Sequence, residues 1–146
     1  MLQWVEMTRK DTGLYKNFQP QTYRLTLDAN KGRLVIDGRK MGPPSHRLTL
    51  HQKGLKIGGA TVTRLDKKGE TEYRVARINH LPTFEQVRLH TKEVLYPGIY
   101  RIALSYELSP EKTQSLKNLK ANTPRRDLVP CIDEPEAWAG TSFEIK

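Results

Sequence analysis

Cysteine and long apolar runs are scarce in this chain of 146 residues. A single cysteine, Cys131, excludes an internal disulfide and favours a reducing compartment. No apolar run approaches the roughly 20 residues that cross a bilayer, and the mean hydropathy of −0.67 argues against burial in a membrane. Residues 1–6 lack the cationic start and apolar centre of a secretory signal. We therefore expect a cytoplasmic protein with no membrane partner.

Familiar catalytic motifs are also missing. The chain has no His-Glu-x-x-His, no Gly-x-Ser-x-Gly and no phosphate loop. Its four histidines are scattered, and His51 and His90 fall on the polar phase of their segments, so we expect both to be exposed. Cys131 has no neighbour in sequence that would lower its pKa, which favours a small buried residue over a nucleophile. The residues alone predict no catalytic group, no metal site and no cofactor in this chain.

Positive charge is in excess, with 25 Lys and Arg against 16 Asp and Glu and a formal net charge of +9. Such a surplus can neutralise the phosphates of a nucleic acid. The cations are spread along the whole chain, however, with adjacent pairs only at positions 9–10, 39–40, 67–68 and 125–126. A generally solvated surface is therefore favoured over nucleic-acid binding.

Apolar and polar residues alternate repeatedly from Gln21 onward. Because successive side chains of a strand point to opposite faces, each such run predicts a strand with one buried and one solvated face. The apolar positions are Tyr23, Leu25 and Leu27; Leu48 and Leu50; Tyr73 and Val75; Val87 and Leu89; and Tyr100, Ile102, Leu104 and Tyr106. Short polar segments with glycine at 28–32 and 66–69 are typical of hairpin loops.

No helical pattern of ten residues or more separates these runs between Gln21 and Leu108, which excludes parallel α/β layering. A short helical or irregular segment is expected near residues 109–120, with Ser109 as N-cap. We predict an all-β fold, an antiparallel β-sandwich of seven or eight strands. Residues 1–20 would form an N-terminal arm closed by Pro20, and residues 21–146 a single domain.

The segment from Arg125 to Pro135 combines charges, prolines and the cysteine in a short space. Proline restricts its own backbone and that of the preceding residue, so the segment predicts a rigid, irregular link that leads into a final strand. Asp133 and Glu134 could be a catalytic pair, but neighbouring side chains of an extended chain point apart. A structural role is favoured, with one carboxylate accepting backbone N–H groups or pairing with Arg125 or Arg126.

This segment resembles a hallmark of the aminopeptidase N family of zinc metallopeptidases. In that family an arginine-containing stretch leads to Pro-Cys-Phe-Asp-Glu-Pro and then to a strand similar to Thr-Phe-Asp-Ile. The matching residues are Arg126, Pro130, Cys131, Ile132, Asp133, Glu134, Pro135, Ala137 and 141–145. The runs at 48–57 and 95–106 resemble earlier strands of the family more loosely. The likeness covers roughly residues 21–146, and only its C-terminal motif is specific.

The resemblance implies the saddle-shaped β-sandwich with which such enzymes begin. The chain would then be a noncatalytic first domain, cut before the zinc-binding catalytic domain of the same polypeptide, which would be its partner. The parent enzyme would hydrolyse N-terminal residues from peptides with zinc held by that second domain. The segment from Arg125 to Pro135 would fix the junction between the two domains.

In this family the first domain also contributes a Gln or Glu that binds the free amine of the peptide, because a carboxylate or amide oxygen selects an ammonium group. Counting back from Arg126 places Asn118 and Lys120 near the family's two polar positions, and Lys120 cannot replace a carboxylate. Gln114 lies about four residues too early unless the loop carries an insertion. The resemblance therefore proposes Gln114 or Asn118 as the amine-binding residue.

Two interpretations from other classes remain open. The chain could be a free-standing β-sandwich binding module, since a fold does not determine a function. It could also be a nucleic-acid-binding β-barrel, which would need aromatic side chains stacked beside basic ones on one face. Tyr100 and Tyr106 share the apolar phase of their strand with Ile102 and Leu104, so core packing explains them better.

Overall fold

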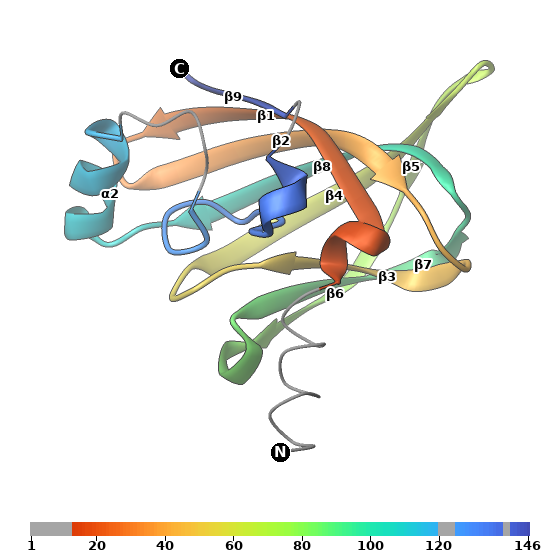
Figure 1. Ribbon diagram of the computed structural model, residues 1–146, viewed down its shortest axis with the longest axis horizontal. Helices are drawn as coiled ribbons and strands as arrows, with labels where there is room; N and C mark the ends of the chain where they lie inside the picture. Colours follow the sequence, from red (N-terminus) through yellow and green to blue (C-terminus); the bar gives the residue numbers. More distant parts are fainter. Residues whose placement is uncertain (1–12, 120–124, 139–140) are drawn as a thin grey trace.

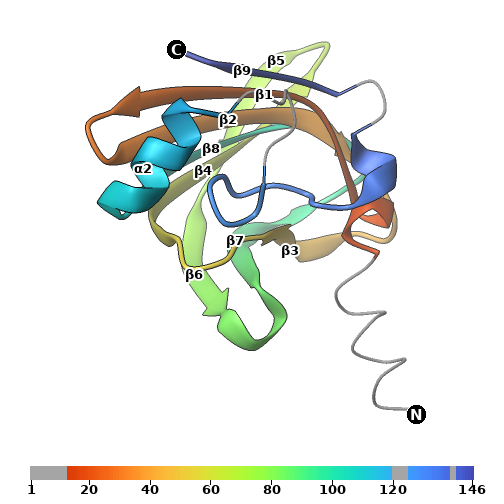
Figure 2. The same cartoon turned by 60° about the vertical axis from the view of Figure 1, so that its left-hand side comes forward.

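Nine strands form two sheets in the computed structural model, which describes residues 13–119, 125–138 and 141–146. The larger sheet has the strand order β5-β4-β8-β2-β1-β9, and the smaller has the order β3-β7-β6. The sheets lie over one another as two layers, and helix α2 lies at one end of the larger sheet (Figure 1, Figure 2). The predicted all-β sandwich is confirmed, although it has more strands than the seven or eight expected.

The larger sheet consists of β1 (Phe18–Asp28), β2 (Lys31–Lys40), β4 (Lys56–Asp66), β5 (Gly69–Tyr73), β8 (Gly98–Glu107) and β9 (Ser142–Ile145). The smaller sheet consists of β3 (Ser45–His51), β6 (Val75–Leu81) and β7 (Gln86–Leu95). Helix α2 spans Pro110–Lys117, and single turns of 3-10 helix span Leu14–Lys16, Pro82–Phe84 and Pro135–Ala137.

The core lies between the two sheets and is made by the apolar phase of each strand. Ile36 of β2 and Leu50 of β3 are among its fully buried side chains, and each such burial contributes roughly 1.5–3 kcal/mol to folding. Tyr100 and Tyr106 are buried in the same core, as their position in the apolar phase of β8 predicts. They are therefore not available to stack on bases.

The predicted hairpin loops are confirmed at both glycine-containing segments. Strands β1 and β2 pair as far as Asp28 with Lys31, and β4 and β5 pair as far as Asp66 with Gly69. Gly69 has a φ of 123°, a left-handed conformation that glycine adopts without steric cost. The turn chemistry of the sequence thus fixes two of the antiparallel pairings.

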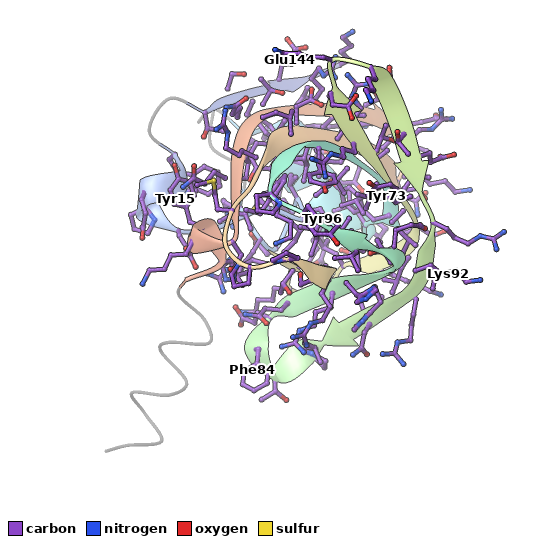
Figure 3. All side chains as sticks on the ribbon, turned by 90° about the vertical axis from the view of Figure 1, so that its right-hand side faces the viewer. Tyr15, Tyr73, Phe84, Lys92, Tyr96 and Glu144 are labelled. Carbon is purple, nitrogen blue, oxygen red and sulfur yellow. The ribbon has the colours of Figure 1, made fainter. Side chains whose placement is uncertain are left out.

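One predicted run is divided between the two sheets. Tyr73 ends β5, which pairs with β4, whereas Val75 begins β6, which pairs with β7. The alternation of side chains continues through Arg74, so the sequence pattern gives no sign that the strand changes partners there. Figure 3 shows Tyr73 and the exposed Tyr96 near this end of the sandwich.

The first strand begins earlier than expected. β1 starts at Phe18, so Pro20 lies inside the strand instead of closing an arm, and residues 1–12 of that arm lie outside the described residues. Pro20 pairs with Gly38 of β2 at a bulge, before β1 meets β9 at Thr22. The strand tolerates the missing N–H of proline because only one neighbour pairs with it at this point.

The last strand, β9, pairs with β1 in parallel, from Thr22 with Ser142 to Leu25 with Ile145. Every other strand pairing in the described part of the chain is antiparallel. Lys146 extends the ladder with hydrogen bonds to Leu25 and Leu27. The expected final strand is therefore present, and it forms one edge of the larger sheet (Figure 1).

The predicted helix near residues 109–120 is also confirmed as α2. The hydroxyl of Ser109 accepts a hydrogen bond from the backbone N–H of Lys112 at 3.2 Å, which is the expected N-cap. Leu116 buries one face of the helix against the core. No helix in the described residues is long and apolar enough to cross a membrane.

Candidate functional site

The segment 125–138, which we call the junction segment, runs beside the free edge of β3. His51 and Cys131 exchange two backbone hydrogen bonds, of 2.7 and 3.0 Å, in an isolated antiparallel bridge. The backbone N–H groups of Leu128 and Val129 both donate to the carbonyl of Arg125 and close a tight turn. The segment is irregular, as its prolines predict, and it leads into β9.

Arg126 holds the two ends of the junction segment together. Its Nε lies 2.9 Å from Oδ2 of Asp133, its Nη2 donates to the carbonyl of Asp133 at 3.2 Å, and its Nη1 lies 3.2 Å from Oε1 of Glu85. Its own carbonyl accepts the N–H of Lys53. Arg125 instead forms an exposed pair with Asp127. Among the described contacts of the two adjacent arginines, those of Arg126 reach the connections next to β3 and β7.

Glu134 is buried and binds backbone N–H groups far away in sequence. Its carboxylate accepts hydrogen bonds from Gly13, Leu14 and Tyr15 at 2.7, 3.0 and 3.0 Å. A carboxylate that accepts several N–H groups gains charge-assisted hydrogen bonds of the stronger kind. The structural role expected for this acidic pair is thus observed for both residues, although Glu134 caps a distant segment and not its own turn.

The expectation that His51 is exposed is wrong. Its side chain is fully buried, and its Nδ1 accepts the backbone N–H of Asp133 at 2.9 Å. The junction segment covers this polar position of β3, and the covering residues are about 80 positions away in the chain. His90 was also expected to be exposed, but it is half-buried and its Nε2 has no hydrogen-bond partner among the described residues.

Cys131 is fully buried, as expected for a packing residue. Burial, followed by the charge of Asp133, raises the pKa of its thiol well above the ordinary value. The neighbouring backbone is anchored by two core tyrosines: Tyr23 accepts the N–H of Ile132, and Tyr106 donates to the carbonyl of Leu128, both at 3.0 Å. This environment disfavours the thiolate that a nucleophile would need.

A pocket of about 420 Å³ lies beside the junction segment. Its lining residues are Lys53, Glu85, Lys112, Arg125, Arg126, Asp127 and Asp133. Each carboxylate faces a cation within 4 Å, and Lys112 donates to the carbonyl of Lys53. With acids and bases paired in this way, the pocket presents a surface of both charges.

Gln114 and Asn118 are exposed; Gln114 lies on α2, and Asn118, four positions later, is its C-cap residue. They share a face of the helix because residues four positions apart lie one above the other. Neither is among the residues that line the pocket beside the junction segment. Lys120, the other position suggested by the resemblance, lies outside the described residues. The structure brings the junction residues together, and α2 contributes Lys112 to the pocket beside them.

The described residues do not fit a zinc site. No group of three or more His, Cys, Asp or Glu side chains within them is arranged to hold a metal ion. His80 accepts the N–H of Ile57, and Nδ1 of His46 lies 3.2 Å from the carbonyl of Thr91. These rings are engaged with backbone groups on different strands.

No protein-family model and no curated protein matches this chain. The case for its function therefore depends on its own residues and geometry.

A second pocket was not predicted from the sequence. It is lined by three cations, Lys40, Arg47 and Arg88, and by no carboxylate. Lys40 follows Leu34, Ile36 and Gly38 at intervals of two, so it occupies the inward phase of β2 and is 3% exposed. A lysine on the apolar phase of a strand is the signal that could have located this pocket.

Proposed function

We propose that this chain is the noncatalytic N-terminal β-sandwich domain of an aminopeptidase N-like zinc peptidase. The observation that carries the proposal is the junction segment, in which the residues that resemble the family motif form one network. Arg126 binds Asp133, Glu134 binds the backbone of residues 13–15, and the chain then enters β9. A motif used in this way sets the path of the chain into β9.

The role of this domain would be to pack on the catalytic domain and to form one wall of the substrate cleft. Its partner would be the catalytic domain of the same polypeptide, which would hold the zinc ion and bind the peptide. Zinc supplies a water molecule activated for attack when it is bound there. This chain would contribute position and recognition only, and the exposed Gln114 or Asn118 is proposed to contact the amine of the peptide.

Three measurements test this proposal. Reading the gene beyond codon 146 should reveal a continuing chain with His-Glu-x-x-His, whereas a stop codon there would contradict the proposal. The isolated chain should not hydrolyse aminoacyl-4-nitroanilides with or without zinc, and the product of the extended gene should. In that product Gln114→Ala or Asn118→Ala should raise KM for peptides more than it lowers kcat, because a binding group is lost. The exposed Gln21→Ala is the control.

The alternative is a free-standing β-sandwich module whose function is to bind a ligand. It is supported by the second pocket, whose three cations are not needed for a junction between domains. The stop codon described above would favour this alternative. Under this alternative, the contacts of Arg126 would only stabilise the fold of the chain itself.

A further inference from the structure

The second pocket, a cavity of about 390 Å³, lies along β3. It is bounded by residues 13–18 on one side and by the connection from β2 to β3 on another, and it reaches the neighbouring strand β7. Figure 3 shows one of its lining residues, Phe84, at the tip of the connection between β6 and β7. Its polar lining residues are Asn17, Lys40, Ser45, Arg47, Thr49, Gln86 and Arg88. We call this cavity the basic pocket.

Lys40 is a buried cation that has no carboxylate beside it. Its ammonium group donates to the carbonyls of Met41 and Pro43 at 3.2 and 3.0 Å. An ammonium group has three donors, so one remains for a ligand. Burial lowers the pKa of Lys40 from its ordinary value, and no nearby acid offsets that effect. A bound anion would supply the missing counter-charge.

Arg47 and Arg88 approach the same space from adjacent strands. Arg47 pairs with His90, and Thr49 pairs with Arg88, so all four side chains lie on one face of the smaller sheet. Diagonal neighbours of this kind are roughly 7–8 Å apart at the backbone, within reach of a common ligand for two long side chains. Neither arginine side chain has a hydrogen bond or ion pair in the described part of the chain.

A third arginine increases the charge on this face. Arg77 of β6 pairs with His90 from the other side, which places His90 between Arg47 and Arg77. Burial and the charges of Arg77, Arg47 and Arg88 lower the pKa of His90. Several cations thus lie close together on this face and repel one another. A bound anion would reduce this repulsion.

We propose that the basic pocket binds a small phosphate-bearing molecule, with its phosphate between the guanidinium groups of Arg47 and Arg88 and the ammonium group of Lys40. Phosphate carries more than one negative charge and several acceptor oxygens, and planar guanidinium groups match it in pairs. A monocarboxylate would neutralise only one of the three cations. The volume lies within the range of about 300–1,000 Å³ typical of small-molecule sites.

Two features argue against a nucleic acid as the ligand. Recognition of single strands relies on aromatic side chains for stacking. The exposed rows of this face contain instead Arg47, Thr49, Arg77, Asn79, Arg88 and His90. Lys40, Arg47 and Arg88 also line one pocket and do not form an extended track along the sheet. This proposal does not depend on the aminopeptidase proposal.

The test is calorimetric titration of the whole chain with inorganic phosphate and with pyrophosphate. Both should bind at one site per chain, and pyrophosphate should bind more tightly. Arg47→Gln and Arg88→Gln should each weaken pyrophosphate binding by about tenfold or more, as expected when a charged hydrogen-bonding group is lost. Arg33→Gln removes the same charge from an exposed position of β2 and should change the affinity by less than about twofold.

Circular dichroism and thermal unfolding establish that each variant is folded. Arg47 is exposed, so its substitution remains informative even if the Arg88 variant unfolds. Three results would overturn the proposal: no saturable binding of either anion, equal weakening by Arg33→Gln and Arg47→Gln, or binding only to oligonucleotides or to anionic vesicles.

Discussion

The guanidinium group of Arg126 donates hydrogen bonds to the carboxylate and to the backbone carbonyl of Asp133, and it also reaches Glu85. The two side chains of this pair are 19% and 29% exposed, so solvent screens the pair only in part. The guanidinium group is planar and can serve three acceptors in fixed directions, which an ammonium group cannot. This side chain therefore adds to the backbone bridge between His51 and Cys131 in fixing how the junction segment meets the smaller sheet.

Replacing Arg126 by lysine is expected to lower the free energy of unfolding by about 2 kcal/mol, because charged hydrogen bonds are lost next to partly buried carboxylates. Urea denaturation measures the change. The matched control is Arg125→Lys, since the pair of Arg125 and Asp127 is 59% and 32% exposed and such pairs contribute less than about 1 kcal/mol. Equal losses in the two variants would contradict the role given to Arg126.

Glu134→Gln should loosen the attachment of the first described residues. The amide side chain keeps one acceptor oxygen but loses the charge that three backbone N–H groups now share, so we expect a loss of about 1–3 kcal/mol. The amides of Gly13, Leu14 and Tyr15 should exchange faster in hydrogen–deuterium exchange. Glu136→Gln, at an exposed position two residues away, is the control. Unchanged exchange at residues 13–15 would show that the carboxylate does not hold them.

The thiol of Cys131 should resist modification while the protein is folded. Burial raises its pKa, so the thiol stays protonated near pH 8, where an unperturbed cysteine with a pKa of about 8.5 is partly ionised. Reaction with a disulfide reagent should be slow in the native protein and fast in concentrated guanidinium chloride. Rapid labelling without unfolding would contradict the buried position of Cys131.

His90 should make stability depend on pH in the acidic range. Because its folded-state pKa is lowered, the unfolded chain takes up a proton first as the pH falls through about 6.5, and unfolding is then favoured. The contribution of His90 to the free energy of unfolding is therefore complete above about pH 6.5. It is lost as the pH falls toward the folded-state pKa of His90. In the variant His90→Asn, the free energy of unfolding should change less with pH over this range. Urea denaturation at several pH values measures it.

A second variant tests whether the neighbouring arginines lower the pKa of His90. Arg77→Gln removes one of the charges that lower the pKa of His90, so the free energy of unfolding should again change less with pH while His90 remains in place. A nuclear magnetic resonance titration of the His90 ring should show a higher pKa in this variant. An unchanged titration would mean that the facing arginines do not act on His90.

The strands were predictable from the sequence because alternation depends only on local residues. Tyr23 and Leu25 of β1, and Leu48 and Leu50 of β3, are buried on the phase that the pattern indicates. The N-cap role of Ser109 was predictable for the same reason, since a cap acts within one turn. Features that depend on a few neighbouring residues were thus available before the structure was known.

Features that depend on distant partners were not predictable. His51 follows the polar alternation of β3, yet the junction segment covers it, and nothing near His51 in sequence indicates this. Arg47, Arg77 and Arg88 look like ordinary solvated residues until strand pairing places them around His90. The change of sheet at Arg74 was not predictable either. The chain there leaves its pairing with β4 and begins to pair with β7, but apolar and polar residues continue to alternate.

The parallel contact of β9 with β1 has a consequence for how the protein is made. Strands as far apart in sequence as β1 and β9 close a long loop when they pair. Such contacts form late because closing the loop costs conformational entropy. During synthesis β1 can pair with β2 early, while its other edge waits for residues 142–145 to emerge. Until residues 142–145 emerge, this edge of β1 can pair with wrong strands. Incorrect pairing at this edge of β1 must therefore be avoided, for example by a chaperone, until β9 has formed.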